Sequence, residues 1–206
     1  MSAPGWKRWP AIRALARGQR NLASRVGPAA ATLVYHLDYQ MPENPLVDTR
    51  RAERILDYLT REGCVTSRHL RRPEGVSIEQ LLRVHEYGYL ESLGQGDVLE
   101  RIFGEPVLLR DIDKLIAVQR RMVAGTVLAA RLAVKHWRQG RPVVNLGGGL
   151  HHARAALGAG FCIFNDIGVA IRQLRAEGYD GRILVVDLDL HQGDGTRRIF
   201  AEDETV

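Results

Sequence analysis

The stretch ILVVDLDLHQGDGT, residues 183–196, decides the fold, because an apolar run rich in β-branched residues passes directly into acidic residues. The apolar run predicts a strand over residues 182–190. Side chains alternate along a strand, so Asp187, Asp189 and His191 would share one face. Ligands of open α/β sheets bind at the carboxyl ends of the strands, and this strand end is therefore the predicted site.

The Asp-x-His pair formed by Asp189 and His191 can direct a carboxylate oxygen and an imidazole nitrogen at one cation. Zn²⁺ accepts this mixture of ligands, as do Fe²⁺ and other divalent ions. A solvated strand end would explain one carboxylate, but burying several without a cation or a partner would be costly. Gly193 and Gly195 favour a sharp turn that returns Asp194 to the same site.

Two adjacent histidines lie on a glycine-rich loop in NLGGGLHHARAALGAGFCIFND, residues 145–166. The glycine spacing fits neither the dinucleotide-binding nor the Walker phosphate-binding pattern, so nucleotide binding is disfavoured. The glycines instead let the backbone turn so that His151 and His152 enter one pocket. Tandem imidazoles beside an Asp-x-His pair are components of a metal-assisted hydrolase, with the histidines in acid–base roles.

Strand and helix patterns alternate along the rest of the chain. Further strands are predicted over residues 31–36 and 142–146, the second of them buried. The predicted helices cover residues 49–62, 77–93, 113–138 and 165–177. Ser77 and Gln80 form a capping box at the start of the second helix. These βαβ units predict the α/β class, with a three-layer αβα arrangement and a mostly parallel sheet.

The positive charge is concentrated at the N-terminus. The net charge of +5 includes six basic residues within residues 1–30, a segment without acids: Lys7, Arg8, Arg13, Arg17, Arg20 and Arg25. Leaving out these six of the 29 basic residues leaves 23 against 24 acidic ones, or −1. We therefore predict a basic arm over residues 1–30 and a domain over residues 31–206 that does not bind nucleic acid directly.

The role of the arm stays open. Its apolar residues recur every three positions, which is weakly amphipathic, at Trp6, Trp9, Ile12 and Leu15. Contact with a membrane surface, organelle targeting, docking on the protein itself and a frayed or misannotated N-terminus are the alternatives.

Composition narrows the class of protein. With 45% hydrophobic and 26% charged residues, the chain resembles soluble globular proteins. No stretch approaches the ~18 apolar residues that a membrane helix needs, and no signal peptide is recognisable. The two cysteines, Cys64 and Cys162, favour free thiols in a reducing compartment. A cytoplasmic location is the prediction.

The motifs NLGGGLHHA, GFCIFNDIGVAI and VVDLDLHQGDG, in this order, resemble the zinc-dependent histone deacetylase family. The family has an arginase/deacetylase-like α/β fold and includes acetoin-utilisation proteins and acetylpolyamine amidohydrolases. The strict resemblance spans residues 145–200, and residues 35–93 are consistent with the family's N-terminal part. Gln192, where many members carry a second histidine, is similar to the class IV-like branch.

The resemblance implies a role for each motif residue. His152 matches the general base, and His151 matches its tandem partner. Asp187 and Asp194 match the carboxylates that pair with the first and the second histidine. The segment Gly160 and Phe161 matches the lining of the acyl-lysine tunnel.

The resemblance also implies the metal ligands. Asp189 and His191 match two of three zinc ligands, and the backbone around them and Asp187 is similar to a structural K⁺ site. The family's third ligand, an Asp, and its oxyanion-stabilising Tyr would both follow residue 206. We therefore expect the chain to be the N-terminal part of a catalytic domain, truncated at its C-terminal side.

The implied activity is hydrolysis of an acetyl or other short acyl amide of lysine, a polyamine or a small amine. Two alternatives from other classes are a non-catalytic fragment or pseudoenzyme, and one half of an enzyme completed by a separate C-terminal half. A binuclear manganese ureohydrolase is disfavoured, because Gly193 stands where its Asp-x-His-x-Asp pattern needs a carboxylate.

Overall fold

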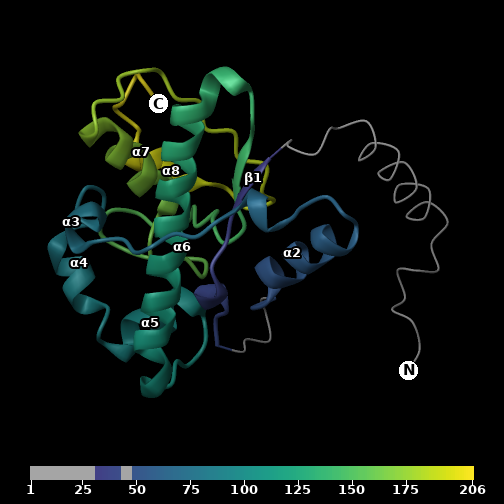
Figure 1. Cartoon of the computed structure of the whole chain (residues 1–206). Helices are drawn as coiled ribbons and strands as arrows, with labels where there is room; N and C mark the ends of the chain where they lie inside the picture. The colour runs from purple at the N-terminus through teal and green to yellow at the C-terminus, as the bar shows by residue number, and fades with distance from the viewer. Residues whose placement is uncertain (1–30, 43–47) are drawn as a thin grey trace, which may run out of the picture.

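The structure, a computed structural model, describes residues 31–42 and 48–206 of the chain (Figure 1). The basic arm predicted over residues 1–30 lies outside the described residues, so its separation from the domain stays a prediction. Within the described part, no helix is both long and apolar enough to cross a membrane.

One parallel sheet organises the described part of the chain. Its central strand is β1 (Thr32–Val34), which pairs with β2 (Leu70–Arg71) on one edge and β3 (Val143–Asn145) on the other. Both pairings are parallel. Because parallel neighbours require crossover connections, the helices must pack against the sheet, and the α/β class with a parallel sheet is confirmed.

The helix α6 (Leu109–His136) is the longest in the described part of the chain and packs against β1 and β3. Figure 1 shows α6 running through the centre, with α3, α4 and α5 on one side and β1 and α2 on the other. The helix α7 (Asp166–Ala176) packs along α6. The other helices are α2 (Arg51–Arg61), α3 (Ile78–Leu81), α4 (Tyr87–Ser92), α5 (Gly96–Phe103) and α8 (Asp194–Ile199). Single 3₁₀ turns lie at η2 (Leu37–Tyr39), η3 (Ser67–His69) and η4 (Trp137–Gln139).

Two groups of buried side chains hold these elements together. The larger one joins α3 through α7 and has at its centre Leu81, Leu99, Val123, Ile163, Phe164 and Val169. The smaller one joins α2 and the segment after β1 to α6, and consists of Tyr35, Tyr39, Ala52, Val118 and Met122. Burial of apolar area is the main favourable term in both, and both meet beneath the loop that follows β3.

Most predicted helices are confirmed. The segment predicted over residues 49–62 contains α2, the capping box of Ser77 and Gln80 is present, and Asn165 caps α7. The long helix begins earlier than predicted, at Leu109, and ends before Gly140, whose φ of 60° suits only glycine well. The strand β2 and the helix α5 were not predicted.

The single helix predicted over residues 77–93 is wrong, because α3 and α4 are separate helices. Between them the chain turns His85 into the core, where it is 2% exposed. The carbonyl of Arg154 can only accept, so Nδ1–H of His85 donates to it at 3.0 Å. Nε2 of His85 then accepts from the amide of Asn165 at 3.0 Å. His85 can form these two hydrogen bonds because the helix is interrupted between α3 and α4.

The strand predicted over residues 182–190 is also wrong, because the structure assigns no regular secondary structure there. A strand requires a hydrogen-bonded neighbour, and the described sheet ends at β3 without reaching this segment. Its side chains Leu188 and Leu190 are 90% and 94% exposed. The same uncovered edge explains why Val144 in β3, predicted to be buried, is 41% exposed.

His85 predicts how the stability of the fold depends on pH. Burial lowers its pKa from 6.5 to about 4, and protonation would place an Nε2–H against the amide of Asn165. Between these two values the unfolded chain binds more protons than the folded chain, so stability falls as the pH is lowered. We expect His85 to account for a loss of about 3 kcal/mol between pH 6.5 and pH 4.

The measurement is the free energy of unfolding by urea at several pH values for the wild type, His85→Gln and the control His136→Gln. The His85 variant should lose less stability on acidification than the wild type, whereas the control should follow the wild type. Parallel curves for all three proteins would contradict the assignment.

Candidate active site

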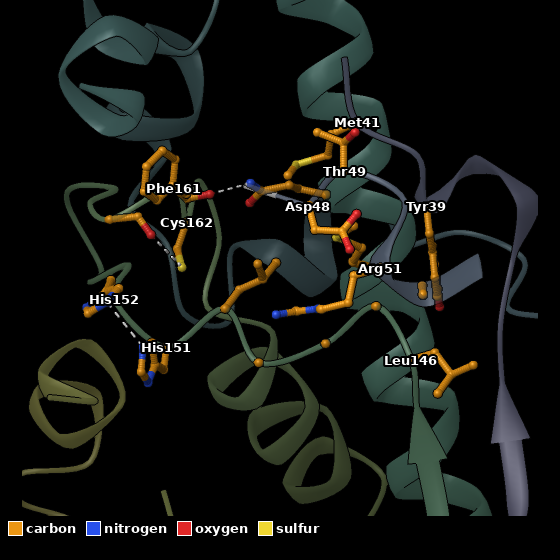
Figure 2. Close-up of a pocket in the computed structure, with 18 of the residues that line it drawn as sticks. Tyr39, Met41, Asp48, Thr49, Arg51, Leu146, His151, His152, Phe161 and Cys162 are labelled. Carbon is orange, nitrogen blue, oxygen red and sulfur yellow. Dashed lines mark hydrogen bonds between the residues drawn. The ribbon is translucent and has the colours of Figure 1, made fainter. Parts of the chain in front are cut away.

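A cavity of about 380 Å³ lies where the glycine-rich loop, α6 and the segment 189–191 meet. Figure 2 shows His151 and His152 at one end of the cavity, Tyr39 and Leu146 at the other, and Arg51 between them. The predicted site residues that line it are His151, His152, Gly160, Phe161, Asp189 and His191. The structure therefore brings residues from both sequence motifs into one cavity, in the size range of small-molecule sites.

The path of the glycine loop is fixed by the buried carboxylate of Asp166. It accepts hydrogen bonds from the amides of Gly149 at 3.0 Å and Leu150 at 2.7 Å, and from the hydroxyl of Thr126 at 2.5 Å. Burial raises the pKa of Asp166, while these donors act against that rise. A Cβ on Gly148 would lie 2.7 Å from Oδ2 of Asp166, so the close approach requires glycine.

Asn165 ties the histidine loop to two helices. Its Oδ1 accepts from the amide of Gly168 at 2.8 Å and so caps α7. Its Nδ2 donates to the carbonyl of Ala153 at 3.0 Å and to the hydroxyl of Thr196 in α8 at 3.0 Å. Because Asn165 is fully buried, these bonds have no competition from water, and the loop is held between α7 and α8.

The tandem histidines contact each other and one predicted carboxylate. Nδ1 of His151 lies 2.6 Å from Oδ2 of Asp187, and this bond lowers the pKa of Asp187. The Nε2 atoms of His151 and His152 are 3.2 Å apart, so one nitrogen must donate and the other accept. One hydrogen bond therefore joins the two rings, and Figure 2 draws it as a dashed line.

The second predicted carboxylate, that of Asp194, lies farther from its predicted histidine partner. Oδ1 of Asp194 lies 3.8 Å from Nδ1 of His152, which is longer than a hydrogen bond. Arg154 approaches Asp194 at 2.5 Å and is the main reason that the pKa of Asp194 is lowered. The pKa of His152 itself is lowered, first by burial and then by the neighbouring His151.

Asp189 and His191 are suitable as a pair of metal ligands. Oδ1 of Asp189 is 3.1 Å from Nδ1 of His191, and both side chains reach the cavity. Two ligands on one tetrahedral Zn²⁺ are separated by roughly 3.3 Å, given bonds near 2.0 Å. Within the described part, no cluster of three or more His, Cys, Asp or Glu side chains is placed to hold a metal, so the fit covers two ligands.

The turn at Gly160 and Phe161 forms the wall of the cavity beside His152. Phe161 is the one non-glycine residue with a positive φ, 66°, in the described part of the chain. Cys162 follows it and is buried, which raises its pKa to about 12 and keeps it a neutral thiol.

Sequence reasoning missed several residues that shape the site. Asn165 and Asp166 are the first two residues of a predicted helix, and an Asn at that end is a capping signal that could have identified them. Gln119 lies on the apolar face of a predicted helix, and a polar residue there signals a buried partner. Arg51 and Tyr39 line the cavity without any local sequence signal.

A family model described as "Histone deacetylase domain" matches residues 45–206. The chain is 35% identical to an uncharacterized protein of Picosynechococcus sp., over 84% of this chain and 57% of that protein. It is 32% identical to "Histone deacetylase 2" of Arabidopsis thaliana, over 77% of this chain and 41% of that protein.

A solved structure, described as an HDAC homolog complexed with SAHA, has a TM-score of 0.64 and 25% identity to this chain. The match covers 82% of this chain and 47% of that one, and it confirms the predicted deacetylase-like fold. The chain spans about half the length of the curated relatives that it matches.

Gly160 predicts how tightly the wall is packed against His152. A Cβ on Gly160 would lie 2.4 Å from Cδ2 of His152, and the φ of 51° adds backbone strain. Gly104 has a φ of 72° but no atom within 4 Å of its would-be Cβ. Gly104→Ala should therefore cost about 1 kcal/mol from strain alone, and Gly160→Ala should cost about 1–3 kcal/mol more. Urea unfolding of both variants tests the difference, and equal losses would mean that the contact with His152 is loose.

Proposed function

We propose, since the chain belongs to the histone deacetylase domain family, that it carries the acid–base residues and two metal ligands of a deacetylase. The reaction is hydrolysis of an acetyl or other short acyl amide to a carboxylic acid and a free amine. The observation that carries the proposal is the hydrogen bond of 2.6 Å between His151 and Asp187, in contact with His152. The cavity that His151 and His152 line is also lined by Asp189 and His191.

The metal in this proposal is Zn²⁺, with Fe²⁺ as an alternative that accepts the same ligands. Asp189 and His191 would hold it, together with ligands from outside the described residues. The bound ion would polarise the amide carbonyl and make water more acidic. A structural K⁺ near Asp187 remains part of the proposal by resemblance to the family.

His152 acts as the general base. Burial and the neighbouring His151 lower its pKa, so its imidazole is neutral at pH 7 and can accept a proton from water. Its Nε2 lies 3.2 Å from Nε2 of His151, and its ring lies 5.9 Å from that of His191. Proton removal therefore takes place beside the metal ligands.

His151 performs the opposite step. Asp187 accepts from its Nδ1 and stabilises a positive imidazole. Because His151 and His152 share a proton across 3.2 Å, a proton taken by the base can pass between the rings. Delivery to the leaving nitrogen then releases the amine, so the chain's own residues account for both proton transfers.

The substrate class in this proposal is an acylated lysine, an acylated polyamine or a small amide. The cavity of about 380 Å³ has an apolar wall at Phe161, Leu150 and Met122, which suits an acyl group and a methylene chain. The solved homologue in complex with SAHA supports occupancy by a small ligand. Cys64 and Cys162 are both free thiols, which supports a reducing, cytoplasmic setting.

The remaining part of the domain would pack on the exposed segment before the metal ligands. An apolar stripe there consists of Leu184, Val186, Leu188 and Leu190, each at least 67% exposed. A stripe of this kind beside unpaired backbone favours strand addition. We propose that further sequence, in the same polypeptide or in a separate C-terminal half, adds strands here and completes the metal site. A non-catalytic role is the alternative.

A polypeptide of residues 1–206 is expected to bind Zn²⁺ weakly and to show no turnover, because catalytic zinc normally has three protein ligands. Asp189→Ala should abolish the weak binding, whereas Asp203→Ala, whose carboxylate pairs with Arg172, should retain it. Titration calorimetry with Zn²⁺ measures both. Nanomolar affinity of this polypeptide, or hydrolysis of an acetyl-lysine peptide by it, would show that two ligands suffice.

Once the domain is complete, acetate should be released from an acetyl-lysine peptide or an acetylpolyamine. His152→Ala should then lower kcat by about 10²-fold or more, because the general base is removed. His136→Ala, at the C-terminal end of α6, is the control and should leave kcat unchanged. Wild-type turnover by the His152 variant would assign the base elsewhere, and absence of any acetate release would refute the proposed activity.

A further inference from the structure

The wall of the cavity is a two-residue hairpin turn with an unfavourable residue in it. Ala159 and Cys162 exchange both backbone hydrogen bonds, at 3.1 and 2.8 Å, across Gly160 and Phe161. The φ values of these two central residues are 51° and 66°. Positive φ at both positions defines a type I′ turn, which favours Asn and Gly. A phenylalanine in the second position must be held there by its surroundings.

Three contacts from outside the turn hold Phe161. Its amide donates to the carbonyl of Ile102 at 3.0 Å. Its ring packs edge-to-face on Phe103, with centroids 6.0 Å apart. Its carbonyl accepts from Nε2 of Gln119 at 2.6 Å, and this bond is the dashed line at Phe161 in Figure 2.

Gln119 uses both ends of its amide on this segment. Its Oε1 accepts from the amide of Ile163 at 2.8 Å, so the side chain bonds to the backbone on both sides of Cys162. Gln119 is 0% exposed and lies on the apolar face of α6. An apolar residue would suit that face better, because a buried amide is costly unless it is fully bonded. The hydrogen bonds to the turn and to Ile163 explain why a polar residue, Gln119, lies on this apolar face.

The turn is also packed directly against an acid–base residue. A Cβ on Gly160 would lie 2.4 Å from the ring of His152, so the turn has no room to move toward the histidine. Gln119, Gly160 and Phe161 all line the cavity. A displacement of the turn would therefore change both the width of the cavity and the surroundings of His152.

We propose that Gln119 is a positioning residue, which holds the Gly160–Phe161 turn in its left-handed conformation and thereby sets the width of the cavity beside His152. That this wall meets the acyl-bearing chain rests on the proposed function. The hold of Gln119 on the turn does not, because it follows from the two hydrogen bonds and the φ values alone.

The experiment compares Gln119→Met, which keeps length and removes both polar groups, with the control Gln173→Met. Gln173 is also a buried glutamine, but it lies on α7 and bonds to Arg83 and Glu177. Amide hydrogen exchange of the full chain, followed by NMR, is the readout. The Ile163 amide loses its acceptor directly, so the informative amides are those of Phe161 and Cys162, whose acceptors are untouched.

Gln119→Met should speed exchange at Phe161 and Cys162 about tenfold or more, the scale of a lost buried hydrogen bond. The control should leave both rates unchanged. The strong intraresidue amide-to-Hα NOE of Phe161, a signature of positive φ, should weaken in the Gln119 variant. Exchange rates equal to those of the control, with an unchanged NOE, would overturn the proposal.

Rescue separates positioning from a general structural role. Glycine adopts positive φ without strain, so in a Phe161→Gly background the change Gln119→Met should speed exchange at residue 162 much less. If Gln119→Met fails to fold, folding of the double variant supports the proposal and failure of the double variant refutes it. Absence of acetate release by the completed enzyme would refute the proposed function alone and leave these outcomes unaffected.

Discussion

The start of α7 is the point on which the candidate site depends. Asn165 and Asp166 are both 0% exposed, and together they bond to the glycine loop, to the chain after the tandem histidines and to α8. Adjacent positions on one buried turn therefore fix both flanks of His151 and His152. Because unpaired buried polar groups are costly, neither side chain can be removed without leaving several partners unsatisfied, and the loop has one path available.

This arrangement explains how the site forms without a regular strand beneath it. The segment 182–190 has no sheet partner in the described part of the chain, yet Asp187 reaches His151 at 2.6 Å. Gly193 makes the approach possible, since a Cβ there would lie 2.1 Å from Oδ2 of Asp187. The hydrogen bond from His151 to Asp187, and the absence of a Cβ at Gly193, thus bring the acidic motif next to the histidine motif.

The sequence predicted elements whose signals are local. The capping box of Ser77 and Gln80 and the end of the long helix before Gly140 were both recognisable, because a cap depends on a few neighbouring residues. Prediction from the sequence failed where contacts between residues far apart in the chain determine the structure. His85 breaks a predicted helix to reach Arg154 and Asn165. The segment 182–190 has the composition of a strand, but pairing depends on neighbours that local pattern does not specify. Arg154, a second partner of Asp194 beside the predicted His152, also had no local signal.

The three carboxylates of the second motif differ in how fully their charges are already matched. Asp187 is engaged by His151 and Asp194 by Arg154, and in each case that partner is the main cause of a lowered pKa. Among the described residues, the Asp189 carboxylate bonds only to the backbone and ring of His191. Its side chain is 53% exposed, and the residue lines the cavity. A cation entering the cavity would therefore find lone pairs available on Asp189, whereas Asp187 and Asp194 are already bonded to His151 and Arg154. The charges around each acid thus support the proposed role of Asp189 as a metal ligand and the proposed pairing of Asp187 with His151.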